Sequence, residues 1–171
     1  MLSDMTKQSI IKDGAIQQNS WQLINPSESG EYQLPSSGDI IVPLKLWQNQ
    51  AELLGQHSGK VGVWINSDEE PEWIADKLQK LPLIAINFPI FTDGRGYSYA
   101  RLLRERYGFQ GEIRAIGDVT QDQLFYMRRC GFDSFSLKEG KEIEPALNSL
   151  ASISHFYQAA VDQPQPLFRR R

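Results

Sequence analysis

The run Leu83-Ile84-Ala85-Ile86-Asn87-Phe88 decides the fold class, because all but one of its side chains are apolar. A strand that is apolar on both faces is typical of a parallel sheet covered by helices. A helical pattern follows over residues 98–107 and ends at Gly108, and a second apolar strand covers residues 113–119. This succession predicts strand-helix-strand units joined by right-handed crossovers.

The same alternation of strand and helix patterns extends in both directions along the chain. The expected strands are residues 40–42, 61–65 and 132–137, and the expected helices are 44–54, 70–80, 120–130 and 143–160. In the helix at 120–130, Thr120 and Gln123 have the spacing of a capping box, and Gly131 is the expected stop. About five units predict one α/β domain with a parallel sheet and helices on both faces. We prefer an open doubly wound sheet to the alternative of an incomplete (βα) barrel, because a closed eight-unit barrel needs about 250 residues.

The N-terminal part of the chain has the pattern of a β-hairpin. Asp13-Gly14 is a turn signal between the apolar runs at 10–12 and 21–24, and residues 25–38 have the composition of a loop. We expect a single α/β domain over residues 1–160. It consists of the hairpin and loop (1–38) and the βα core (39–160), and a C-terminal tail covers 161–171.

Composition excludes several classes of function. The 171 residues have a net charge of −3, which argues against nucleic-acid or anionic-membrane binding. One cysteine and two histidines leave little for a metal site, and we expect none. The N-terminus lacks a signal-peptide pattern and no run is long enough to cross a bilayer, so we expect a cytoplasmic protein.

The arginines are distributed unevenly. All ten lie beyond residue 94, and the first of them belongs to the loop Asp93-Gly94-Arg95-Gly96-Tyr97-Ser98. Two glycines, an arginine and the following helix N-terminus suit a small anion such as sulfite, sulfate or phosphate. The alternative is a tight loop in which Asp93 and Arg95 pair with each other.

Arg114 and Asp118 are the candidate catalytic residues. Arg114 lies in an otherwise apolar strand, where an unpaired charge is unfavourable. Asp118 is expected on the same face, since strand side chains alternate. One interpretation is a structural pair between the two residues. The other is a clamp in which Arg114 reaches the anion, while Asp118 orients Arg114 or acts as a base.

Two features are candidates for binding a partner protein. On the helix at 98–107, Arg101 and Arg104 are expected on an exposed face. In the tail, Leu167, Phe168 and Arg169 are candidates for an anchor in a partner's groove or for a subunit-exchange arm, and a solvated chain end is the alternative. Cys130 and the histidines His57 and His155 are expected to be packing or surface residues.

The motif Phe88-Pro89-Ile90-Phe91-Thr92-Asp93-Gly94-Arg95-Gly96-Tyr97-Ser98 resembles the signature of a bacterial family known as domain of unknown function 934. The resemblance continues over residues 100–104, 111–119, 122–133 and 166–169. Members are typically encoded beside sulfite reductase and are described as probable oxidoreductases involved in sulfite reduction.

The resemblance implies a role in assimilatory sulfite reduction. We expect an accessory protein that acts with sulfite reductase and binds a small oxyanion. The alternatives are an enzyme acting on a sulfur oxyanion or a nucleotide-linked sulfate, and a flavin-dependent oxidoreductase. The sequence leaves open whether the chain is an enzyme and whether it forms a homo-oligomer. No cofactor is evident, because the sequence lacks a cysteine set for an iron–sulfur cluster and a nicotinamide fingerprint.

Overall fold

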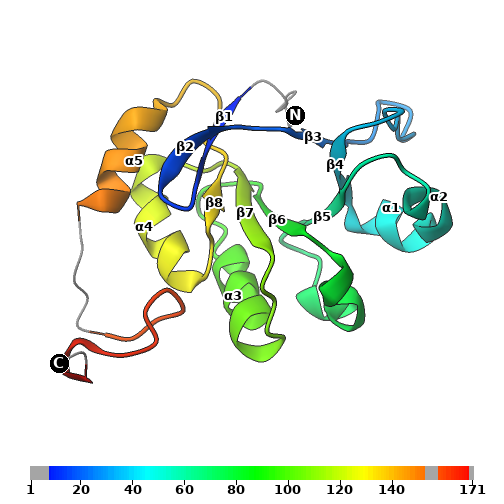
Figure 1. The fold of residues 1–171 in the computed structure, drawn as a ribbon. Coiled ribbons are helices and arrows are strands. Elements are labelled where there is room, and N and C mark those ends of the chain that lie inside the picture. The colour runs from blue at the N-terminus through cyan, green and yellow to red at the C-terminus, as the bar shows by residue number, and fades with distance from the viewer. Residues whose placement is uncertain (1–7, 153–157, 170–171) are drawn as a thin grey trace.

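The computed structural model describes residues 8–152 and 158–169, and the expectation for His155 lies outside them. One eight-stranded sheet organises the chain (Figure 1). Its strands are β1 (Ser9–Lys12), β2 (Ala15–Gln18), β3 (Trp21–Leu23), β4 (Asp39–Pro43), β5 (Val61–Ile65), β6 (Leu83–Phe88), β7 (Glu112–Gly117) and β8 (Ser134–Phe135). The helical elements are α1 (Leu44–Asn49), α2 (Ala51–Gly55), η2 (Pro71–Lys80), α3 (Arg95–Arg101), η3 (Leu102–Arg106), α4 (Gln121–Cys130), α5 (Ile143–Ala151) and η4 (Leu167–Arg169).

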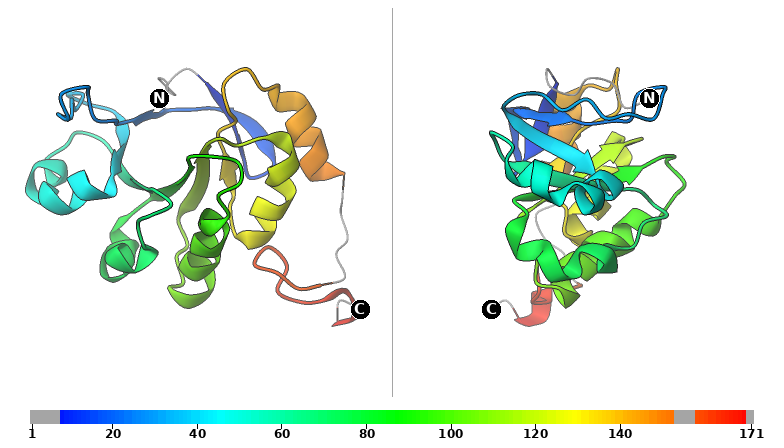
Figure 2. Two further views of the ribbon diagram at one scale, coloured as in Figure 1. Left: turned by 180° about the vertical axis from the view of Figure 1, so that it is seen from behind. Right: turned by 90° about the vertical axis from the view of Figure 1, so that its right-hand side faces the viewer.

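The strand order is β2-β1-β8-β7-β6-β5-β4-β3, and β3 to β8 are parallel. The α/β class and the parallel sheet are confirmed. Because consecutive strands from β3 to β8 are neighbours, the order of the parallel strands never reverses as it does in a doubly wound sheet. The sheet curls into a half-barrel, and the helices lie along its outer face (Figures 1 and 2). The incomplete-barrel alternative therefore describes this arrangement.

Both faces of the sheet are buried. On the outer face, side chains such as Ile84 and Ile86 belong to a large core with the helices. The inner face has a smaller apolar cluster, to which Leu83 and Ala85 contribute. All six side chains of β6 are therefore buried, as the apolar run predicts.

The N-terminal hairpin forms with a different partner strand from the expected one. β1 pairs with β2 across a turn in which Asp13 and Gly14 have positive φ angles, as a type I′ turn requires. Trp21–Leu23 does not join this hairpin but pairs with β4 in parallel. β2 and β3 thus lie at opposite edges of the sheet, although only Asn19 and Ser20 separate them.

Several expected helices differ in detail. The helix at 44–54 is interrupted at Gln50, and residues 71–80 form a 3₁₀-helix. The helix at 98–107 begins earlier, at Arg95, and ends in the π-turn η3. The capping box of α4 and the left-handed Gly131 at its end are confirmed. Within residues 8–152 and 158–169, no helix is long and apolar enough to span a bilayer.

Candidate functional site

The carboxyl ends of the parallel strands surround a pocket of about 970 Å³, which we call the mouth pocket. Barrel-like parallel sheets place their sites at this end, because loops from several strands converge there. The lining residues are Gln8, Asn25, Pro26, Trp64, Asn87, Phe88, Pro89, Gly117, Asp118, Ser136, Leu137, Lys138, Glu139 and Gly140.

Asn87 and Gly117 form one wall of the mouth pocket. Asn87 is the second-last residue of β6 and is only 9% exposed, and its Nδ2 donates to Asn66 Oδ1 at 3.0 Å. Its Oδ1 has no hydrogen-bond donor among the described residues. Gly117 has φ = 91°, and a Cβ there would lie 2.4 Å from Asn87 Oδ1. The close approach of the two strand ends therefore requires glycine at position 117.

Asp118 connects the mouth pocket to the loop after β6. Its Oδ2 accepts the Phe91 N–H at 3.1 Å, and its Oδ1 lies 3.1 Å from Lys138 Nζ. Lys138 keeps 53% of its side chain exposed. Asp118 therefore lies at the strand end, where sites are expected, but its contacts orient a loop and not Arg114.

Arg114 lies on β7 and is only 1% exposed. Its Nη2 and Nε donate to Glu112 Oε1 at 2.7 and 2.9 Å, and its Nη1 donates to Asn19 Oδ1 at 2.9 Å. Ser134 Oγ accepts from Nε at 3.2 Å, and Lys12 pairs with the other Glu112 oxygen at 2.8 Å. The expected pairing with Asp118 is thus wrong, since Glu112 is the carboxylate partner.

Within the Asp93–Ser98 loop, Arg95 binds the carboxylate of Asp93. Asp93 accepts from Arg95 three times, from the backbone N–H at 3.2 Å and from Nε and Nη2 at 3.0 and 2.7 Å. Arg95 Nη2 also donates to Ser67 Oγ at 3.1 Å. Hydrogen bonds from Arg95 and Ser67 hold the pKa of Asp93 far below its ordinary value. The geometry matches the alternative of an internal pair, and an external oxyanion would have to displace Asp93.

The remaining loop residues have packing roles. Gly96 lies in α3, where a Cβ would be 2.7 Å from the Phe88 ring, so helix and strand approach closely. The Tyr97 ring contacts Phe88 and Tyr126 at centroid distances of 5.2 and 5.1 Å. Gly94 is the N-cap residue of α3, and Ser98 lies inside the helix, past the capping position.

Of the two arginines expected on an exposed helix face, only Arg101 lies there. It pairs with Glu105 at 3.7 Å. Arg104 instead donates inward to the carbonyl oxygens of Gly131, Phe109 and Gly111, at 3.0, 2.8 and 2.7 Å. The exposed position expected for Arg104 is wrong, and its contacts are those of a structural residue.

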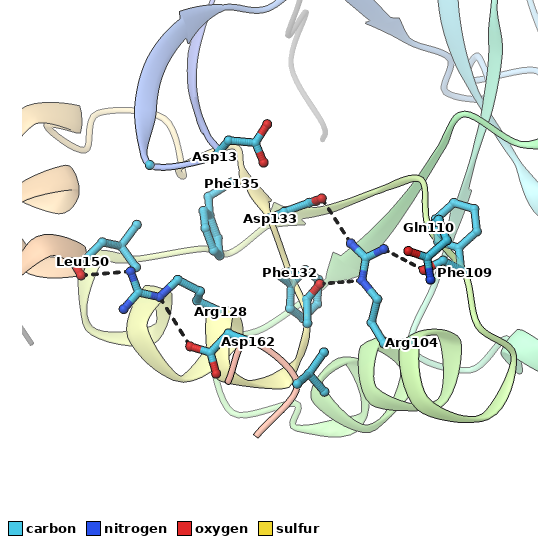
Figure 3. A pocket seen from close by; sticks show the side chains of 13 residues that line it. Asp13, Arg104, Phe109, Gln110, Arg128, Phe132, Asp133, Phe135, Leu150 and Asp162 are labelled. Carbon is cyan, nitrogen blue, oxygen red and sulfur yellow. Dashed lines mark hydrogen bonds and ion pairs between the residues drawn. The ribbon is translucent and has the colours of Figure 1, made fainter. Parts of the chain in front are cut away.

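Arg104 belongs to a second pocket, of about 630 Å³, at the opposite ends of β7 and β8 (Figure 3). There it pairs with Asp133 at 3.1 Å, and Arg128 lies 3.8 Å from Asp162. Burial raises the pKa of Asp133. This end of a barrel-like sheet usually carries stability and not chemistry. Because these arginines also bind backbone carbonyls (Figure 3), we assign the second pocket a structural role.

The tail reaches α4 before its exposed end. Val161 N–H donates to the Arg129 carbonyl at 3.2 Å, and Arg129 Nη1 donates to Asp162 at 2.8 Å. Leu167 and Phe168 are exposed, and the Arg169 guanidinium lies 5.8 Å from the Phe168 ring centroid. Binding of a partner by these three residues stays a prediction.

Cys130 is buried, and burial raises the pKa of its thiol, so it matches the expected packing residue. Within the described ranges, no three His, Cys, Asp or Glu side chains are grouped to hold a metal.

Sequence reasoning missed two exposed apolar side chains, the rim residues, which follow Pro89 of the mouth pocket in the chain. Ile90 and Phe91 are 58% and 60% exposed on the loop after β6. That loop is fixed, because Asp118 accepts the Phe91 N–H and Gln123 Nε2 donates to the Phe91 carbonyl at 3.4 Å. It also missed Trp64, Asn87 and Lys138. Asn87 has a signal in the sequence, since it is the one polar residue of its strand and lies next to the strand end.

Comparison with known proteins places the chain in a family. A search of curated proteins finds none similar to this chain. A family model described as a bacterial protein of unknown function (DUF934) matches residues 62–168. The match contains the Asp93–Ser98 loop, the rim residues and all of β6, β7 and β8. The chain therefore belongs to the DUF934 family of bacterial proteins.

Proposed function

We propose that this chain is an accessory protein of assimilatory sulfite reduction in the cytoplasm, and that it docks on sulfite reductase through the loop at residues 89–92. The role in sulfite reduction follows from the family resemblance. The docking surface is supported by one observation, the exposure of Ile90 and Phe91 on a loop that internal hydrogen bonds already hold in place.

Two properties make this loop a suitable contact surface. Large apolar side chains at the centre of an interface contribute most of the binding free energy. A loop that is ordered before binding loses little conformational entropy when the complex forms. Tyr126 on α4 is also exposed, and its helix contributes the Gln123 hydrogen bond that fixes the loop. The surface thus joins two elements of the outer layer.

The enzymatic alternative with an arginine clamp has less support. It requires guanidinium groups that can turn toward a substrate, yet Arg114 is almost fully buried and donates to Glu112, Asn19 and Ser134. Arg95 donates to Asp93 and Ser67. The contacts favour a binding role over the clamp.

Co-purification tests the proposal. Tagged wild-type chain is expected to retain sulfite reductase from a cell extract at moderate salt, and the double variant Ile90→Ser/Phe91→Ser is expected to lose it. The matched control is Leu53→Ser/Trp73→Ser, which removes two exposed apolar side chains elsewhere and should retain the reductase. Failure of the wild-type chain to retain the reductase removes the partner. Equal retention by both double variants removes the loop as the surface.

A further inference from the structure

The mouth pocket has the size and position of a small-molecule site, separate from the Asp93–Ser98 loop. Its volume of about 970 Å³ lies at the upper end of the range for ligand pockets. It is lined from β5, β6, β7 and the segment after β8, so the carboxyl ends of several strands contribute. The docking loop at residues 89–92 begins at Pro89, which lines this pocket, but binding of a ligand here does not depend on the docking partner.

The charges of the lining disfavour an anion. Among the described residues that line the pocket, Lys138 is the single cation, and it already pairs with Asp118. Glu139 adds a second carboxylate, which is exposed. Together these side chains carry a net charge of −1, so a sulfite or phosphate ion would gain no net attraction from them. A neutral ligand avoids this penalty.

The Asn87 carboxamide identifies what the ligand must supply. Its nitrogen donates to Asn66, whereas its oxygen is buried and has no donor in the part of the chain that the structure describes. A buried acceptor without a partner costs about 1–3 kcal/mol. Asn87 lines the pocket, and the Cβ–Cγ torsion of asparagine is broad, so a rotation of the carboxamide that gives up the Asn66 hydrogen bond would present the oxygen to a ligand. A ligand with an N–H group would satisfy it.

Trp64 gives the pocket a flat apolar wall. Its indole N–H donates to the Ile24 carbonyl at 3.0 Å, which fixes the ring. Pro26, Pro89 and Leu137 add further apolar surface. A fixed indole ring stacks well with another planar ring.

From these features we propose that the mouth pocket binds a neutral nitrogen heterocycle of nucleoside size that carries an N–H donor. The ring packs against Trp64, and its N–H donates to Asn87 Oδ1. Lys138 and Asp118 lie at the opening, where polar substituents of the ligand reach them.

Amide chemical shifts of the full chain measure this binding. The probes are adenosine and uridine as neutral nucleosides, and sodium sulfite and sodium phosphate as anions. We expect at least one nucleoside to shift the Gly117 and Gly140 amides saturably, while neither anion does. Overturning results are saturable shifts at these glycines with an anion alone, shifts confined to other parts of the chain, or no shifts with any probe.

Two variants and a control sharpen the test. Asn87→Leu keeps the approximate volume but removes the acceptor, and should weaken nucleoside binding about tenfold or more. Asn49→Leu changes an exposed asparagine on α1 and should bind as wild type. Wild-type affinity in Asn87→Leu overturns the role of Asn87.

Glu139→Lys decides the ligand class even if Asn87→Leu does not fold, because position 139 is exposed. It turns the lining charge positive, so an anionic ligand would gain affinity. We expect the nucleoside affinity to change less than about twofold. Tighter binding of sulfite than of either nucleoside in this variant and in the wild type overturns the proposal.

Discussion

The Arg114 guanidinium donates a hydrogen bond to the side-chain oxygen of Asn19 at 2.9 Å, although 95 residues separate the two in sequence. Asn19 lies in the two-residue link between β2 and β3, the edge strands of the sheet. The same oxygen accepts the Trp21 N–H at 3.1 Å. A central strand thereby fixes the point where the chain crosses from one sheet edge to the other.

Arg114→Met is expected to lower the free energy of unfolding by about 3 kcal/mol, because it leaves buried polar partners without their donor. Glu112 keeps Lys12, but Asn19 loses the guanidinium. Urea denaturation measures the change. Arg101→Met is the control, since its ion pair is exposed and is worth less than about 0.5 kcal/mol. Equal losses in the two variants would contradict a structural role for the buried network.

Glu112 is expected to make stability depend on pH in the acid range. Burial alone would raise the pKa of Glu112, but the Arg114 charge and hydrogen bonds from Lys12, Arg114 and Ser134 outweigh it and lower the pKa. The unfolded chain therefore takes up this proton at higher pH than the folded one. The contribution to stability is complete above the unfolded pKa of about 4.3 and is lost as the pH falls through the folded value.

Glu112→Gln tests this dependence by urea denaturation between about pH 5 and 3. The slope of stability against pH should become shallower than in the wild type, by at most about 1.4 kcal/mol per pH unit. Asp133 acts in the opposite sense, because burial raises its pKa, but it is present in both chains and cancels in the comparison. Identical slopes would show that Glu112 does not titrate differently on folding.

Local sequence patterns predicted most helices and strands. Where they predicted the wrong side-chain partner, a local change in the backbone is the cause. The apolar run of β6 and the capping box of α4 formed as predicted because neighbouring residues determine them. Alternation on β7 places Glu112, Arg114 and Asp118 on one face only if the strand stays extended. The left-handed φ of 91° at Gly117 ends the alternation before Asp118, so Glu112 is the partner.

Arg104 shows that a helical pattern also fails to predict exposure where the backbone departs from regular α-helix. The Tyr107 N–H donates to the Leu102 carbonyl at 3.0 Å, an i→i+5 hydrogen bond that forms a π-turn. One such turn shifts the helical periodicity, and Arg104 then faces Gly131 and not solvent. Two features depend on contacts between residues that are distant in sequence, and no local pattern contains such contacts. One is the link at Asn19 between the sheet edges, and the other is the mouth pocket.

Gly117→Ala is expected to destabilise the protein more than Gly140→Ala. Both glycines have positive φ, so alanine at either site is strained by about 1–2 kcal/mol. At Gly117 the added Cβ would also meet Asn87 Oδ1 and the Phe88 carbonyl at 2.4 and 2.5 Å, whereas no atom lies within 4 Å at Gly140. Thermal or urea denaturation gives both values. Equal destabilisation would mean that the strand ends at the mouth can move apart freely.

Asp118→Ala is expected to free the docking loop without unfolding the sheet. The carboxylate accepts the Phe91 N–H at 3.1 Å, and this bond ties the loop to the end of β7. Hydrogen exchange of the Phe91 amide should accelerate about tenfold or more, since the loss of a charge-assisted bond is worth about 1.5–3 kcal/mol. Asp122→Ala is the control, because Asp122 is exposed in the first turn of α4. If Phe91 exchanges at the wild-type rate in Asp118→Ala, the Asp118 bond does not hold the loop. Its order would then depend on other contacts, such as the Gln123 bond to the Phe91 carbonyl and the Asp93 N–H bond to the Ile90 carbonyl.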